Sequence, residues 1–240
     1  MKGWMRWGSA AVLMGMAIAG EISLAAHRPV AVPALQESAF AAFGGLRSIA
    51  AEVVWFRADR LQENGRYVEL AQLARTLTLM EPHTPEVWSY AAWNLGYNIS
   101  VMMATFEDRW RWVLASIELL RDDGLRLNPD SAELYRELAW TFQLKLGANI
   151  DSAAPLYREK WREIVRDVER RGAWEELGMT RERMDEVERA YGIVERGHPQ
   201  YSALYWAHFG LKCAETKNER IFLMEIIRQA QAIYLRTRGA

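Results

Sequence analysis

The sequence predicts an all-α protein of stacked antiparallel helical hairpins, arranged as an irregular α-solenoid. Three observations predict it. Apolar residues from Val87 to Met102 follow spacings of three and four, the stripe that a helix buries. Glycines and prolines divide the remaining periodic segments into helix-length pieces. Proline also precedes an aromatic residue by six positions three times, as if ending one helix and wedging the next against it, at Pro82 and Trp88, Pro129 and Tyr135, and Pro199 and Tyr205.

Composition describes an ordinary folded chain and excludes some partners. The 240 residues carry a formal net charge of -1, with 25% charged residues, which argues against nucleic acid as a partner. The single cysteine, Cys213, excludes an internal disulfide and any cysteine-based metal or haem site. We expect Cys213 to be a buried small apolar residue, since no histidine or cysteine is positioned in the sequence to activate it.

The first 28 residues have the character of a membrane anchor or signal segment. Lys2 and Arg6 precede an apolar stretch from Trp7 to Ala26 that Glu21 interrupts. A cleaved signal peptide, an uncleaved transmembrane anchor and a buried core helix all remain open. Tryptophans at the start of the stretch favour the anchor, and the basic residues before it place the following domain outside the cytoplasm. Residues 29–44 are expected to form a proline-containing linker, and residues 45–240 the helical-repeat domain.

Helix boundaries in this domain follow from capping and breaking residues. Thr84 is expected to cap the helix that begins at Pro85, and Asp130 with Glu133 has the spacing of a capping box. Thr180 is expected to cap a helix over residues 181–191. The predicted hairpins pair residues 46–64 with 67–80, the helix from 85 with one entered near Trp112, residues 130–147 with 151–172, and residues 201–215 with 218–235.

The first hairpin resembles a tetratricopeptide repeat (TPR). Gly65, Tyr67 and Pro82 have the spacing of that motif, and Ala58 occupies its small-residue position. The second unit has extra residues at 102–106, Leu70 replaces a small residue, and residues 172–200 fit no repeat. The runs AAWNLGYNIS, DRWRWV, LYRELAW and ALYWA look like those of bacterial membrane-anchored helical-repeat proteins with no established activity. That resemblance supports the architecture and leaves the ligand open. Together with Lys2 and Arg6 before the apolar stretch, it leads us to expect a single-pass protein of the bacterial inner membrane whose domain faces the periplasm or the cell exterior.

No catalytic or metal-binding motif is found in the sequence, so we expect no enzyme activity, metal or cofactor. None of the four histidines has ligand spacing. Asp59 and Glu63 could pair as acid and base, but nearby arginines favour ordinary ion pairing. In the run DRWRW, we expect Trp110 and Val113 to face the core, with Arg109 and Arg111 reaching outward.

The candidate binding groove follows from the aromatic wedges. Trp93 and Trp140 lie five residues beyond Trp88 and Tyr135, and we expect them on the inner, concave side. The residues one position after each aromatic wedge should face the same concave side; these are Ser89, Arg136 and Trp206. Paired asparagines on an aromatic helix can offer amides to a peptide, or can tie the array together. The predicted groove comprises Trp55, Asp59, Gln62, Trp93, Asn94, Tyr97, Asn98, Arg136, Trp140, Gln143 and Trp206, with Ser89 beside them.

Two functions remain open at this level. Exposed aromatic residues with a few charges and amides suit recognition of a protein or peptide partner, so we expect a membrane-tethered scaffold that mediates protein binding or assembles an envelope complex. The alternative is a non-catalytic module that binds glycan or another envelope polymer on the same aromatic groove. For the site itself one further alternative is open, in which residues 172–200 fill the groove and its tryptophans are buried core residues. The oligomeric state is left open.

Overall fold

The computed structural model describes residues 53–54, 56–58, 60–61, 63–192 and 195–238. Within these residues the chain is helical without strands, which confirms the all-α prediction. The predictions for residues 1–28 and 29–44, and those for Trp55, Asp59 and Gln62, lie outside the described residues. Among the helices described here, none is both long and apolar enough to cross a bilayer.

The described helices follow the predicted segments closely. Residues 53–63 are helical wherever they are described. The later elements are α4 (Tyr67–Met80), α5 (Pro85–Trp93), η1 (Asn94–Ile99), α6 (Ser100–Met102), α7 (Phe106–Glu118), η2 (Leu119–Gly124), α8 (Leu125–Leu127), α9 (Ala132–Trp140), η3 (Thr141–Leu146), α10 (Ala154–Arg171), η4 (Trp174–Leu177), α11 (Arg181–Tyr191), α12 (Pro199–Cys213) and α13 (Lys217–Arg238).

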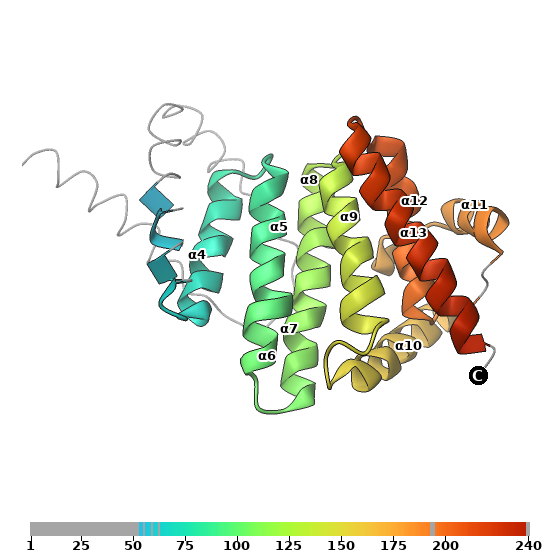
Figure 1. Ribbon diagram of the computed structural model, residues 1–240, viewed down its shortest axis with the longest axis horizontal. Helices are drawn as coiled ribbons and strands as arrows, with labels where there is room; N and C mark the ends of the chain where they lie inside the picture. The colour runs from blue at the N-terminus through green and yellow to red at the C-terminus, as the bar shows by residue number, and fades with distance from the viewer. Residues whose placement is uncertain (1–52, 55, 59, 62, 193–194, 239–240) are drawn as a thin grey trace, which may run out of the picture.

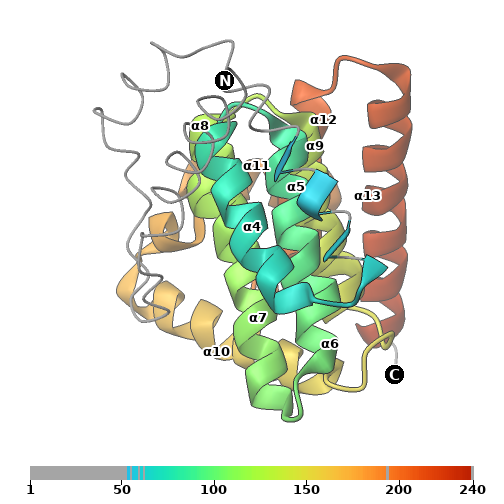
Figure 2. The same ribbon diagram turned by 90° about the vertical axis from the view of Figure 1, so that its left-hand side faces the viewer.

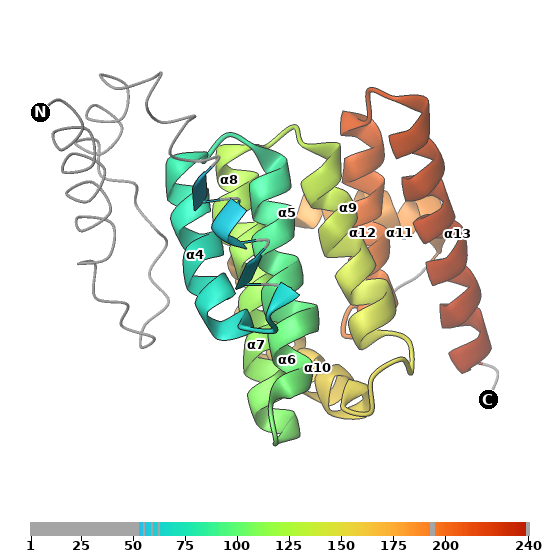
Figure 3. The ribbon, with the colours of Figure 1, turned by 60° about the vertical axis from the view of Figure 1, so that its left-hand side comes forward.

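Successive helices lie side by side in chain order across most of the molecule. In Figure 1 this row runs from α4 through α5 and α9 to α12 and α13, and α7 packs against α5 and η1 beside it. Viewed from the α4 end, α10 lies on one side of the row and α13 on the other (Figure 2). The α12 helix packs against both α9 and α13, whereas α10 contacts α7, η3 and η4. The row therefore places α5 beside α9, and these two helices, with the turns η1 and η3 that continue them, carry all of the predicted groove residues that the structure describes except Trp206 (Figure 3).

Three of the long helices contain a π-helical turn that the sequence periodicity did not predict. The turns η1, η2 and η3 interrupt the helices that begin at Pro85, Phe106 and Ala132. A π turn adds a residue to the helical ladder and changes which side chains face a neighbouring helix. Two side chains also bond to backbone carbonyls around η1, since Asn94 Nδ2 donates to the Tyr90 carbonyl at 3.0 Å and the Ser100 hydroxyl donates to the Gly96 carbonyl.

The predicted helix starts are correct in position, but two of the predicted capping interactions are wrong. Thr84 is the N-cap of α5, but its side chain makes no capping hydrogen bond. The N-cap of α9 is Ser131 rather than Asp130, because the Ser131 hydroxyl accepts from the Leu134 amide at 3.3 Å. Thr180 caps α11 as predicted, accepting from the Arg183 amide. Gly172 ends α10 with φ of +70°, a conformation that glycine adopts without a steric penalty.

A continuous apolar core joins α5 to α13. The aromatic wedges Trp88, Tyr135 and Tyr205 are all buried in it, as expected, and Ala92 and Ala139 are buried among them. A smaller cluster of Ala58, Leu61 and Leu70 holds the first hairpin together. Cys213 is half-buried rather than buried, a correction to the sequence prediction, because it lies in the last turn of α12.

Candidate protein-binding face between α5 and α9

An aromatic pair marks the face that α5 and η1 present beside α9. Trp93, at the end of α5, is 44% exposed. Its ring stacks on that of Tyr97 in η1, with centroids 4.3 Å apart and an interplanar angle of 14°. The stack holds the Trp93 indole on a half-buried neighbour, so a large apolar ring is displayed at the surface with little freedom to move.

The two predicted asparagines form a ladder along this helix. Asn98 is half-buried and donates through Nδ2 to Asn94 Oδ1 at 2.8 Å. Asn94 is fully buried, and its own amide group donates to the helix backbone. Asn94 is therefore used within the helix, while Asn98 lies nearer the surface beside Tyr97.

The remaining described groove residues differ widely in exposure. Arg136 and Trp140 on α9 are half-buried, and Trp140 packs against the main core. Arg136 forms an ion pair with Glu137 at 2.8 Å. Its guanidinium carbon also lies 5.8 Å from the centroid of the Phe222 ring on α13.

Gln143 and Trp206 are core residues in this arrangement, with 0% and 3% exposure. Gln143 Nε2 donates to the Ile226 carbonyl at 3.3 Å, which ties η3 to α13. The turn after η4 covers Trp206, since a Cβ built on Gly178 would lie 3.1 Å from the end of its indole. Residues 172–200 thus cover the α12 part of the predicted groove and leave Trp93 exposed.

Electrostatic interactions between side chains indicate which residues of α5 and α9 lie opposite one another. The Glu133 carboxyl on α9 lies close to the Ser89 hydroxyl and the Glu86 carboxylate on α5. Burial is the main cause of its raised pKa, the Ser89 hydroxyl opposes the shift, and Glu86 adds to it. Further along, burial raises the pKa of Tyr97, with Thr141 opposing and Glu137 adding to that shift. Three carboxylates, Glu86, Glu133 and Glu137, therefore lie along the α5–α9 face, with Glu137 nearest the aromatic pair.

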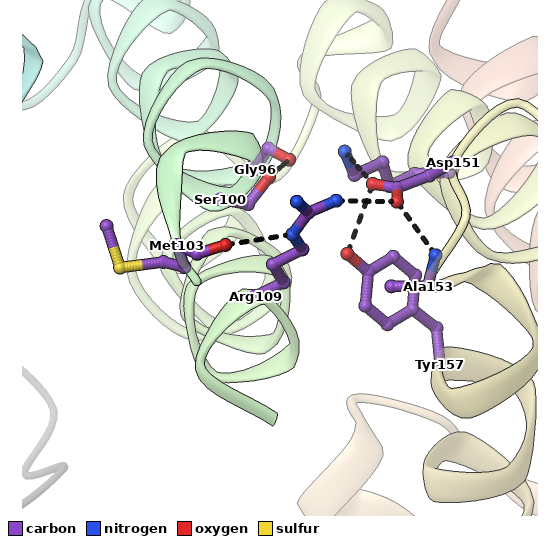
Figure 4. A network of polar contacts seen from close by, with 8 residues as sticks. Gly96, Ser100, Met103, Arg109, Asp151, Ala153 and Tyr157 are labelled. Carbon is purple, nitrogen blue, oxygen red and sulfur yellow. Dashed lines mark hydrogen bonds and ion pairs between the residues drawn. The ribbon is translucent and has the colours of Figure 1, made fainter. Parts of the chain in front are cut away.

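A buried charge network lies behind this face, where η3, α7 and α10 meet. Lys145 of η3 contacts Asp151 at 2.7 Å, and the side chains are 3% and 5% exposed. The Tyr157 hydroxyl donates to Asp151 Oδ2 at 3.1 Å, and the Ala153 amide donates to Oδ1 at 2.9 Å (Figure 4). The Lys145 ammonium also lies 5.2 Å from the centroid of the Tyr97 ring, so the network supports the aromatic pair from below.

One arginine that was expected to reach outward belongs to this network. Arg111 is exposed as predicted, at 79% of its side chain, and pairs with Asp108. Arg109 points inward, a correction to the sequence prediction: its Nε donates to the Met103 carbonyl at 3.1 Å and its Nη1 lies 3.5 Å from Asp151 (Figure 4). Trp110 and Val113 face the core, as expected.

Sequence reasoning missed the acidic residues of the face and the whole Lys145–Asp151 network. A lysine between two leucines near the end of an apolar helix was the available signal for Lys145, since such a position suggests burial. The carboxylates carried no comparable signal, because glutamate is common on exposed helix surfaces. Only the neighbouring helix shows that they converge.

Comparison with known proteins finds no matching family model, no similar curated protein and no similar solved structure. Among the residues that the structure describes, no group of three histidine, cysteine, aspartate or glutamate side chains is placed to hold a metal ion.

Proposed function

We propose that this chain is a membrane-tethered, extracytoplasmic scaffold that binds a protein segment on the α5–α9 face and so assembles a larger envelope complex. The observation that carries the proposal is the exposed Trp93 ring, stacked on Tyr97 and flanked by Asn98. Exposed, pre-ordered aromatic side chains are the residues that dominate binding energy at protein interfaces. Burial of the Lys145–Asp151 network behind them supplies a rigid base.

The proposal includes a TPR-like array of stacked antiparallel hairpins. The row of helices from α4 to α13 and the recurring buried wedges Trp88, Tyr135 and Tyr205 support it. Arrays of this kind use their surface helices as extended binding sites. Tethering is supported by the apolar stretch after Lys2 and Arg6. Protease added to intact spheroplasts should digest the domain, and digestion that requires lysis would contradict this orientation.

Position-specific photo-crosslinking in cells tests the binding role. Glu86 is exposed and lies two helical turns before Trp93, on the same side of the helix. A photo-reactive residue at position 86 should give a protein adduct, and Trp93→Ala should remove that adduct. The matched control places the same photo-reactive residue at Arg111, which is exposed on α7, and should not give it.

The glycan alternative has its own basis, because a flat exposed indole also suits the face of a sugar ring. Retention of the purified chain on isolated cell-wall polymer, lost in Trp93→Ala, together with no protein adduct from position 86, would overturn the scaffold proposal in favour of that alternative. An adduct that persists unchanged in Trp93→Ala would show that the partner contacts a different face.

A further inference from the structure

The charges around Trp93 restrict the kind of partner that can bind there. Glu86 is exposed at the start of α5, and Glu133 is half-buried opposite it on α9. Among the described residues, neither forms an ion pair within 4 Å, whereas Glu137 shares its charge with Arg136. Behind Tyr97, the buried Asp151 pairs with both Lys145 and Arg109. Of the side chains that the structure describes on the face itself, Arg136 is the one cation beside the three glutamates named here, so the α5–α9 surface carries excess negative charge beside an exposed aromatic ring.

We infer that the α5–α9 face takes a basic segment of a protein partner, with one arginine or lysine side chain laid over Trp93 and further basic side chains facing Glu133 and Glu137. This inference rests on the proposed function and names the chemistry of its partner. A cation is attracted to the negative face of an indole, and a guanidinium also stacks on it. The carboxylates along the same face then provide charge-assisted hydrogen bonds to the other basic side chains of the segment.

Glu133 lies in the face and should couple binding to pH. Burial raises the pKa of this carboxyl in the free protein; Glu86 on α5 and Glu137 on α9 add to the rise, whereas the Ser89 hydroxyl and Arg136 oppose it. A cation placed beside it favours the charged form and brings the pKa back down. Binding should therefore release a proton, and affinity should fall as the pH is lowered through the raised pKa of Glu133. Glu133→Gln should remove this pH dependence.

Fluorescence anisotropy with the full chain purified in detergent provides the test. The probes are a fluorescein-labelled peptide of alternating arginine and serine and a matched peptide of alternating glutamate and serine. We expect the arginine peptide to bind and the glutamate peptide not to bind. Trp93→Ala and Glu137→Gln should each raise the Kd on the order of tenfold, as expected for residues at the centre of an interface. Added salt should also weaken binding.

Matched variants keep the test specific. Glu182→Gln removes one exposed carboxylate from α11 and should leave the Kd within about twofold, the scatter expected of a distant surface change. Trp93→Phe keeps an aromatic ring on Tyr97 and should retain part of the affinity if Trp93→Ala disturbs folding. Equal losses in Glu182→Gln and Glu137→Gln, or equal binding of both peptides, would overturn the inference.

The crosslink at position 86 separates this inference from the proposed function. A captured segment that contains arginine or lysine at the crosslinked site supports both. A captured segment that is acidic or uncharged, and still depends on Trp93, overturns the basic-segment inference and leaves the scaffold proposal standing. A second copy of this chain, crosslinked through a segment without basic residues, overturns the inference in the same way.

Discussion

The ammonium group of Lys145 lies 2.7 Å from the carboxylate of Asp151, and both side chains are almost completely buried. The pair joins the end of η3 to the turn that precedes α10. Removing both charges from water carries a large free-energy cost, which is offset only if each remaining hydrogen-bonding site is used. Here Tyr157 and the Ala153 amide complete the shell of Asp151.

Breaking this pair should destabilise the fold strongly. Lys145→Met or Asp151→Asn leaves one buried polar group without its partner, and each should cost about 3–5 kcal/mol in the free energy of unfolding. Urea denaturation followed by circular dichroism measures the loss. Lys160→Met removes an exposed pairing with Glu163 and should leave the urea midpoint unchanged. Equal effects of the buried and the exposed replacement would contradict the structure.

Acid should weaken the protein through Asp151. Burial acts to raise the pKa of this carboxyl, but Lys145, the Ala153 amide and Tyr157 outweigh it and lower the pKa below the ordinary value of 3.8. A lowered folded-state pKa contributes stability that is present above the unfolded-state value and is lost as the pH falls through the folded-state value. Melting temperature measured from pH 6 downward should fall below about pH 4. In Asp151→Asn the melting temperature should fall less steeply below about pH 4 than in the wild type. The same steepness in both proteins would argue against this role of Asp151.

Replacing a small residue between packed helices by a larger one should destabilise the fold. Ala139 is fully buried on α9, which packs closely against α12. Ala139→Leu should therefore cost about 1–3 kcal/mol by overpacking. Ala190→Leu makes the same change at an exposed site on α11 and is the control. Thermal melts that place both variants at the wild-type temperature would show that α9 and α12 are less closely packed than described.

Two tryptophans should behave differently when truncated. Trp161 is 1% exposed and packs on Phe142, with ring centroids 4.7 Å apart. Trp161→Ala should cost about 3–5 kcal/mol, as expected for a core tryptophan. Trp93→Ala removes a ring that is 44% exposed, so it should cost much less. Chemical denaturation compares the two, and an equally unstable Trp93→Ala would assign Trp93 to the core instead of a binding face.

Much of the helical layout could be predicted from local sequence. The bounds of α4 and α11 match the predicted 67–80 and 181–191, because Gly65, Thr180 and the flanking prolines and glycines act on their immediate neighbours. The capping hydrogen bonds could not be predicted in the same way. Thr84 and Ser131 both precede a helix, and whether a hydroxyl bonds the free amides depends on a rotamer that the tertiary environment selects.

The candidate site was predicted in part, and the division has a physical reason. Trp93, Tyr97 and Asn98 lie on one helix, so their spacing alone places them on a common face. Gln143 and Trp206 have the same kind of spacing, but α13 and the turn at Gly178 cover them. Burial by a helix that is distant in the chain leaves no local signature.

The sequence by itself determined where this chain is helical and which residues lie on the same face of each helix, because both depend on interactions within a few turns. Only the tertiary structure decided that Glu133 lies close enough to Glu86 for their charges to interact, that Arg109 points inward to Asp151, and that Trp93 is exposed while Trp206 is covered. Those outcomes depend on how helices far apart in sequence stack, and on the π turns that set their register. Periodicity within one helix does not specify either.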